Sequence, residues 1–485
     1  MRRFTARIPD PERWPFWLFV TLCIKVLTLG VLLSTHGPDH NGAGRLGLFW
    51  GDTPGYFVPI ESLLENGNYT PDLRMPGYGA LYLLVRLVST PPGTYDVIII
   101  LQVLLAAWSM YVLSRLTYRL SGSRAVFLIT LVTYAVSISV QWYDIMLMTE
   151  SFVTSALILF LDRYHTWHRA RDPKALLIAG CWLTWAIFLK PVLAPVAGIV
   201  LLGIWISRSG RTGLLRDAFI FLLPLIVIDG AWMVRNWIHH QQLIPLTRTL
   251  FVSEDHPDPK LAASRFVLAF GGDIVWWVDP QAELRFFNVG NDQIPGQTNA
   301  TSIHLPERIM TSAYDLDSLA ALSQRILLLK DPSLPAETVE RASAEINAEL
   351  DRYRIAFITE HPIQYHVQSR WLALVRFLKQ SGNPIAYRLT FAEMPFPLKV
   401  IKLFHIALHW CTILLGVIGA VFWWRGSTVR GFVVVPVLLV PFGLLIFPLV
   451  LRFSEHRYFV PFIPFLLIAA VVGLHSRFFK HTSVP

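Results

Sequence analysis

The sequence has little charge and very little cysteine. Charged residues make up 15% of its 485 residues, against roughly 25% in soluble domains, which argues against a soluble globular protein of this length. The three cysteines, Cys23, Cys181 and Cys411, each lie inside an apolar run. Their spacing fits neither a zinc site nor a disulfide framework, so we expect them to be small buried hydrophobic residues.

Apolar residues dominate instead, at 54% of the chain. They recur in runs near the length of about 20 residues that crosses a bilayer, which predicts an all-α polytopic membrane protein. Met1–Pro15 is basic, but the run after it lacks a small-residue cleavage pattern, so we expect that run to remain as a helix. About ten spanning helices are predicted, at residues 16–34, 96–114, 125–142, 144–162, 175–189, 192–207, 217–234, 399–423, 431–450 and 459–475.

The basic residues indicate how these helices are oriented. The formal charge of +9 comes largely from arginine and lysine at the ends of apolar runs, which fits membrane loops better than a nucleic-acid partner. If the helices alternate, these clusters all fall on one side, which the positive-inside rule makes the cytoplasm. Both termini are then inside (N-in/C-in). The clusters lie at residues 2–13, 115–124, 163–174, 208–216, 425–430 and 477–480.

The pattern divides the chain into three parts. Residues 1–234 form a transmembrane module with a first outer loop at 35–95, residues 235–398 a mixed, largely helical outer domain, and residues 399–485 the C-terminal transmembrane helices. Within the outer domain, Ala336–Glu360 has apolar residues at three- and four-residue spacing and is predicted to be a helix. The aromatic and basic stretch Gln364–Leu378 is predicted to lie on the membrane surface.

The stretch Gly51–Tyr82 is too polar to span a membrane and is predicted to hold a site. It contains an acid before a turn, Asp52-Thr53-Pro54-Gly55, and an Arg-x-Pro-Gly-Tyr element at Arg74–Tyr78. A loop that only joined two helices could be much shorter. The short segment Gly77–Val88 carries Arg86, so we expect an interfacial helix there rather than a span.

In their order and sidedness, these motifs resemble the GT-C superfamily of membrane glycosyltransferases. The likeness is narrower to the branch with protein O-mannosyltransferases, the aminoarabinose transferase of lipid A and the Rgt-type bacterial enzymes. It covers residues 1–240 and, more loosely, the ends of the outer domain. Two departures are that Thr53 follows Asp52 where the mannosyltransferases commonly pair two acids, and that Lys190 stands where arginine is common. Further matches are Met148-Thr149-Glu150, Lys190-Pro191, Arg235-Asn236, Glu360-His361-Pro362 and Arg457-Tyr458.

The resemblance implies a GT-C-like fold with juxtamembrane helices in the first outer loop. It also implies transfer of a sugar from a polyprenyl-phosphate donor to an acceptor hydroxyl at the outer face. Displacement at the anomeric carbon needs a carboxylate that takes the acceptor's proton, and cations or helix N-termini that hold the leaving phosphate. We predict Asp52 as the catalytic base; the alternative is that it only caps the helix beginning at Thr53.

The remaining site candidates are one acid and four cations. Glu150 is predicted to position substrate or ligate a metal, the alternative being an acid that is favourable in a first helical turn. Arg74 and Lys190 are predicted to bind phosphate, joined by Arg235 and Arg457. The alternative for each cation is an interfacial anchor that reaches toward lipid headgroups.

Several other residues have open interpretations. The aromatic residues Tyr56, Tyr69, Tyr78, Trp276 and Trp277 could stack on sugar rings or belong to the interfacial aromatic belt.

Charged residues within apolar runs are costly unless they are paired or hydrated. Lys25 and Asp229 are therefore predicted to form a mutual ion pair or to line a wet cavity, and Asp144 to be interfacial and solvated. Glu254–Asp258 lacks the helical spacing of a zinc site and is interpreted as a solvated loop. Asn68–Thr70 and Asn299–Thr301 match the glycosylation triplet, a weak pattern.

The sequence thus predicts an inverting glycosyltransferase of a bacterial inner (plasma) membrane, with its active site facing the periplasm. Its partners would be a polyprenyl-phosphate sugar, a lipid, glycan or protein acceptor, and membrane lipids; a divalent cation is left open. The rival from another class is a transporter or flippase for a lipid-linked glycan, disfavoured by the absence of a two-fold repeat and by charges gathered at the outer interface. A non-catalytic scaffold of envelope assembly is the third alternative.

Overall fold

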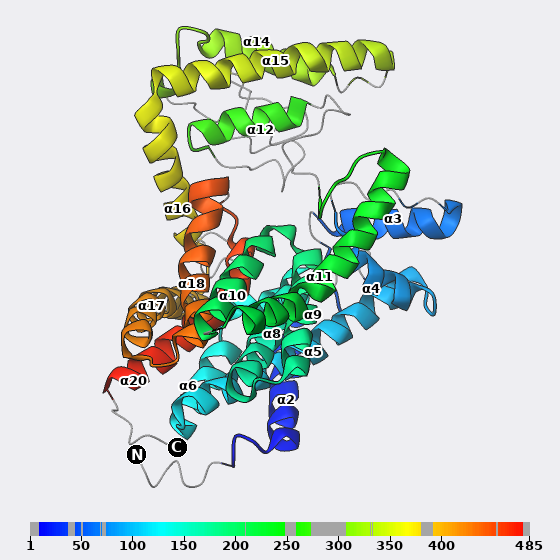
Figure 1. Ribbon diagram of the computed structural model, residues 1–485. Helices are drawn as coiled ribbons and strands as arrows, with labels where there is room; N and C mark the ends of the chain where they lie inside the picture. Colours follow the sequence, from blue (N-terminus) through cyan, green and yellow to red (C-terminus); the bar gives the residue numbers. More distant parts are fainter. Residues whose placement is uncertain are drawn as a thin grey trace. The chain divides into compact units, whose positions relative to one another are not determined.

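The computed structural model describes residues 9–36, 44–49, 52–67, 69, 74–208, 210–247, 259–272, 307–329, 331, 333–379, 391–452 and 454–478. Within these ranges the chain is almost entirely helical, and only isolated β-bridges occur, Leu48 with Met146 and Thr311 with Tyr314. The all-α class predicted from the sequence is confirmed (Figure 1). Contacts divide the chain into two units, the first being 1–247, 380–444 and 456–485 and the second 248–379 with 445–455.

Six helices in the described ranges are long and apolar enough to cross a membrane. A seventh is obtained if α6 (Arg124–Ala135) and the segment Ile138–Asp144, which meet at a bend of 57°, count as one broken span. That segment consists of α7 (Ile138–Gln141) and a 3₁₀ turn (Trp142–Asp144). The predicted count of about ten is not confirmed, because α9 (Pro173–Leu189) and α10 (Ala194–Ser207) are shorter apolar helices. The six are α2 (Trp14–His36), α5 (Pro91–Ser121), α11 (Arg211–His240), α17 (Phe396–Gly426), α18 (Arg430–Leu445) with its continuation to Leu451, and the segment His456–Phe478.

The first unit is built around α8 (Glu150–Ala170). Every side chain from Glu150 to Asp162 is buried, because α8 packs against both α5 and α9. At the far end of α8, Asp162 pairs with Arg115 of α5 at 3.2 Å, and Arg119 pairs with Glu12 at 2.7 Å. The predicted basic clusters around residues 115–124 and 163–174 therefore meet at one end of this bundle. Which membrane face that end occupies stays a prediction.

Two short helices follow the first span. Helix α3 (Thr53–Asn66) ends at Gly67, whose φ of 73° is left-handed, and α4 (Pro76–Arg86) starts with proline, which is favoured at a first helical position. At 14 and 11 residues, neither reaches the length of about 20 residues needed to cross a bilayer. They pack on each other, and α4 also packs on α9.

Glycine at position 77 lets α4 approach α9 closely. A Cβ there would lie 2.5 Å from the backbone oxygen of Phe188 and 2.9 Å from the nitrogen of Leu189. The indole of Trp185 donates a hydrogen bond to the Gly77 carbonyl at 3.4 Å. The glycine of the Arg-x-Pro-Gly-Tyr element is therefore a packing requirement, and it holds the start of α4 against the end of α9.

The second unit contains α12 (Pro259–Ala269), α14 (Leu316–Leu328) and α15 (Ala336–Glu360), and α15 runs beside the other two (Figure 1). The predicted bounds of α15 match the observed ones. The aromatic and basic stretch at 364–378 is helical, as a π-helical turn (Gln364–Gln368) followed by α16 (Ser369–Lys379), and its position on a membrane surface stays a prediction. Residues 445–455 belong to this unit, whereas the sequence assigned them to the C-terminal helices.

Three sequence predictions are corrected in the first unit. Lys25 pairs with Asp144, at 2.6 Å from Nζ to Oδ2, and not with Asp229. Asp144 is 5% exposed and therefore not solvated, while Asp229 accepts a hydrogen bond from the Leu246 amide at 2.8 Å. These partners come from segments that local patterns cannot relate.

The three cysteines are exposed rather than buried, because the apolarity of a run does not say which of its faces turns inward. Some predictions fall outside the described residues: the loop at 254–258, Trp276, Trp277, Asn68, Thr70 and the triplet at 299–301.

Candidate functional site

Asp52 precedes α3 at its N-cap position, but its side chain does not cap the helix. One carboxylate oxygen accepts from Nη2 of Arg74 at 2.6 Å, and the other pairs directly with Nη1 of Arg457. The alternative that Asp52 serves only as a helix cap is therefore wrong. The structure brings together three of the predicted site residues.

Arg74 is held in place by the first turn of α3. Its guanidinium lies 4.6 Å from the ring centre of Tyr56, and its Nη1 donates to the Tyr56 hydroxyl at 2.9 Å. Gly55 leaves room for it, since a Cβ at that position would lie 3.0 Å from Arg74 Nε. Gly55 thus leaves space for the Arg74 side chain, and Tyr56 holds it in place.

Arg457 lies in a 3₁₀ turn (His456–Tyr458) that opens the last candidate span, 405 residues from Asp52. The ring of Tyr458 lies 5.0 Å from the Arg457 guanidinium and 4.6 Å from Nζ of Lys190. Lys190 Nζ also donates to the Arg457 carbonyl at 3.4 Å. Tyr458 therefore joins the two cations, a role that its sequence context did not indicate.

The second carboxylate of the site is Glu150. It pairs with Lys190 at 2.7 Å, and the side chains of both are nearly buried, at 1% and 9% exposed. Glu150 is the first residue of α8, where a negative charge suits the helix dipole. Lys190 ends α9, because the following Pro191 disfavours a helical conformation for the residue before it.

Two buried oxygens beside this pair lack a hydrogen-bond partner among the described residues. They are Oε2 of Glu150 and Oγ1 of Thr149. Buried polar atoms are nearly always satisfied, so these two oxygens are open to a further polar group.

Tyr78 is buried and helps to fix the segment before Glu150. It is 1% exposed, and its ring stacks near that of Phe57, with centroids 5.6 Å apart. Its hydroxyl donates to Gln102 at 2.9 Å, and the Gln102 amide donates to the carbonyls of Asp144 and Met146 at 3.1 and 2.9 Å. This chain of hydrogen bonds fixes the segment that leads into Glu150. Because the Tyr78 ring is buried, it is not accessible for stacking on a sugar in this structure.

Charge favours an anion at this site. Burial alone would raise the pKa of Asp52, but Arg457 and Arg74 outweigh it and hold that pKa well below its usual range. The two acids, Asp52 and Glu150, face three cations, Arg74, Arg457 and Lys190, which leaves one positive charge in excess. Arginine forks match the oxygens of phosphate or carboxylate. The arrangement can therefore bind an oxyanion.

A divalent cation does not fit these side chains as they stand. Both acids are already neutralised by basic residues, and an added metal would meet three positive charges. Among the described residues, no group of three or more His, Cys, Asp or Glu side chains could hold a metal ion.

Arg235, predicted to join the phosphate site, belongs to a different set of contacts. Its Nη2 donates to the Tyr69 carbonyl at 2.6 Å, and its guanidinium lies 5.1 Å from the ring centre of Trp232. Asp229, six residues earlier on α11, accepts a hydrogen bond from the Leu246 amide. Arg235 thus ties the first loop to the end of α11.

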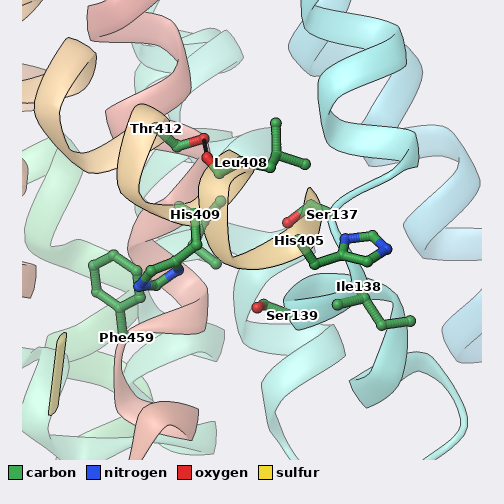
Figure 2. A pocket seen from close by; sticks show the side chains of 9 residues that line it. Ser137, Ile138, Ser139, His405, Leu408, His409, Thr412 and Phe459 are labelled. Atoms are coloured by element: carbon green, nitrogen blue, oxygen red, sulfur yellow. Dashed lines mark hydrogen bonds between the residues drawn. The ribbon is translucent and has the colours of Figure 1, made fainter. Parts of the chain in front are cut away.

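A small pocket opens at the break between α6 and α7. Ser137 and Ser139 line one part of it, and His405 and His409 of α17 another. Figure 2 shows His409 beside Phe459, whose ring centres are 5.4 Å apart, while His405 and Ser137 lie together on the other side. Phe459 is two residues after Arg457, so this pocket adjoins the segment that completes the charged cluster. No sequence motif pointed to this pocket, because its two histidines belong to no recognisable pattern.

Comparisons of this chain with models of known protein families, with curated proteins and with solved structures found no match. The structure therefore defines a helical membrane protein with a buried cluster of two acids and three cations.

Proposed function

We propose that this protein is an inverting glycosyltransferase that moves a sugar from a polyprenyl-phosphate donor to an acceptor hydroxyl, at the outer face of a bacterial inner membrane. The observation that supports it most is the contact of Asp52 with Arg74 and Arg457, because it combines a proton acceptor with phosphate-binding cations. The resemblance of the motifs to those of GT-C enzymes also supports the assignment as a glycosyltransferase.

In the proposed reaction, the acceptor oxygen attacks the anomeric carbon as the bond from that carbon to the phosphate oxygen breaks. Polyprenyl phosphate leaves with the electron pair, and the acceptor proton passes to Asp52. Arg74, Arg457 and Lys190 would stabilise the charge that develops on the leaving phosphate. Attack from the face opposite the leaving group inverts the configuration.

Glu150 and Tyr56 have supporting roles in this scheme. The Glu150 carboxylate positions Lys190, and its second oxygen is open to a hydroxyl of the sugar or the acceptor. Tyr56 positions Arg74 through both its ring and its hydroxyl. The second unit would help to select the acceptor.

The test uses the full-length protein in detergent, a panel of radiolabelled polyprenyl-phosphate sugars and cell-envelope extract as acceptor. Labelled product and free polyprenyl phosphate are followed for the wild type and for Asp52→Asn. Turnover by the wild type that is lost in the variant supports the proposal. If thermal denaturation shows that the protein is folded and no donor gives turnover, that result would count against the proposal.

One observation favours the transporter as a second candidate. The break between α6 and α7, with hydroxyl-lined space beside it, resembles the interrupted helices that form transport sites. Reconstitution into vesicles with a fluorescent lipid-linked glycan tests it. Movement of the label between leaflets without transfer of sugar would show that the protein is a transporter rather than a glycosyltransferase.

A further inference from the structure

The Asp52 carboxylate uses the hydrogen-bonding groups that a phosphate would need. Each of its oxygens is held by a different guanidinium, Oδ1 by Arg74 and Oδ2 by Arg457. A phosphate presents oxygens of the same charge and similar spacing to an arginine fork. Asp52 and a phosphate therefore compete for the same two arginines.

We propose that Asp52 occupies the phosphate subsite in the resting protein, and that the phosphate of a polyprenyl-phosphate ligand displaces it from Arg74 and Arg457. The inference rests on the proposed function for the lipid part of the ligand; the phosphate chemistry rests on the two ion pairs. Asp52 is thus a built-in competitor that is released when the donor binds.

The arginines are held independently of Asp52, which makes this exchange feasible. Arg74 donates to the Tyr56 hydroxyl at 2.9 Å, and Arg457 donates to the Tyr458 hydroxyl at 3.4 Å. Each guanidinium also lies near the ring of its tyrosine, at 4.6 and 5.0 Å. When the carboxylate leaves, the two forks keep their positions for the incoming phosphate.

Lys190 supplies the charge that favours the phosphate over the carboxylate. It stands beside Arg457, bonded to that residue's carbonyl, and its ammonium lies over Tyr458. Its ammonium pairs with Glu150 at 2.7 Å. A phosphate at the forks would lie beside this third cation, whereas the two oxygens of the Asp52 side chain, fixed to the start of α3, are engaged by the arginines.

The exchange couples donor binding to the appearance of the base. With both oxygens engaged by arginines, the Asp52 carboxylate is a poor proton acceptor. Once the phosphate has taken its place between the arginines, the carboxylate can take the proton of an acceptor hydroxyl. By linkage, the free energy by which bound phosphate weakens the contacts of Asp52 with the arginines equals the free energy by which those contacts weaken phosphate binding.

The first test is equilibrium binding of polyprenyl phosphate to the full-length protein in detergent. Asp52→Asn removes the competing charge at nearly constant shape, and we expect it to tighten binding by about 10-fold, because the competing state lowers the apparent affinity of the wild type. Glu61→Gln, an acid of α3 that pairs with Arg86 at 3.0 Å, is the matched control and should not change affinity. Equal or weaker binding by Asp52→Asn would overturn the proposal.

Three probes separate the sources of affinity. Polyprenol, which lacks the phosphate, should bind the wild type and Asp52→Asn equally. A gain for inorganic phosphate in Asp52→Asn would assign the exchange to phosphate alone, and a gain for polyprenyl phosphate only would assign it to the lipid-linked form; either supports the exchange. A gain for polyprenol as large as that for polyprenyl phosphate would overturn it.

A second measurement uses the unaltered protein, in case the variant does not fold. Carbodiimide labels protonated carboxyl groups, so Asp52 should label slowly at rest and at least about threefold faster with saturating polyprenyl phosphate. Mass spectrometry of the peptide spanning residues 46–74 locates the label, with Glu61 as an internal reference. Unchanged or slower labelling of Asp52 would contradict the exchange. Neither test requires sugar transfer, so both stay readable if the proposed reaction is wrong.

Discussion

Asp52 and Arg457 are 405 residues apart in the chain and form a direct ion pair. One lies at the start of the first short helix, and the other lies at the start of the last candidate span. The charged cluster is therefore complete only when the C-terminal segment packs onto the N-terminal part of the first unit.

The first prediction concerns the pH dependence of transfer. A base must be ionised, and in the free protein Arg457 and Arg74 hold the pKa of Asp52 below its usual value despite burial. Because kcat/KM reports groups of the free enzyme, its acid limb should lie below pH 3.8, the ordinary value for aspartate. Because kcat reports the donor complex, in which the arginines have turned to phosphate, its acid limb should lie at higher pH.

Rates across pH for the wild type and for Glu61→Gln provide the measurement. Among the described residues, Asp52 is paired with Arg74 and Arg457, and arginine side chains stay protonated across the range. An acid limb of kcat that coincides with that of kcat/KM would contradict the release of Asp52.

The second prediction concerns the Glu150–Lys190 pair. Lys190→Met leaves a buried carboxylate without its cation, which should cost about 3–5 kcal/mol of stability. Glu12→Gln breaks the more exposed pair with Arg119 and should cost at most about 1 kcal/mol. Thermal denaturation in detergent compares the two. A smaller loss for Lys190→Met than for Glu12→Gln would show that Glu150 has another partner.

The third prediction separates structural from functional cations. Lys25→Met should also cost about 3–5 kcal/mol, because Asp144 would lose its partner inside the bundle. Folded Lys25→Met should still bind polyprenyl phosphate like the wild type, whereas folded Lys190→Met should bind it at least about 10-fold more weakly, since charged hydrogen bonds contribute about 1.5–3 kcal/mol each. Equal loss of binding in both variants would place Lys25 in the site.

The fourth prediction concerns Gly77. Its Cβ would meet backbone atoms of Phe188 and Leu189, which cannot move cheaply, so Gly77→Ala should cost about 1–3 kcal/mol and weaken phosphate binding through Arg74. Gly198→Ala is the control, because a Cβ there has no neighbour within 4 Å among the described residues. Comparable stability of the two variants would show that α4 does not need this close approach.

Local patterns predicted the parts of the fold that depend on local physics. The helix Ala336–Glu360 follows from its apolar spacing, and the failure of Gly77–Val88 to span follows from its length. The number of spans did not follow, because a buried bundle helix such as α8 keeps polar residues that a lipid-facing helix would avoid.

The site was predictable where sequence motifs lie next to it, and less so elsewhere. Asp52 and Arg74 were found as members of one loop, and they do pair. The partner of Lys25 could not be inferred, because its distance to Asp144 depends on how α2 packs on the segment before α8. Tyr458 was noted only beside Arg457, and its contact with Lys190 depends on tertiary packing.

Whether Asp52 is the catalytic base is tested most directly by a single-turnover experiment with the cognate polyprenyl-phosphate sugar. Donor binding and release of polyprenyl phosphate are followed in the same sample. We expect Asp52→Asn to bind the donor about 10-fold more tightly than the wild type and to release polyprenyl phosphate at least about 10²-fold more slowly, the usual contribution of a general base. Release at the wild-type rate by the variant would contradict the assignment of Asp52 as the base.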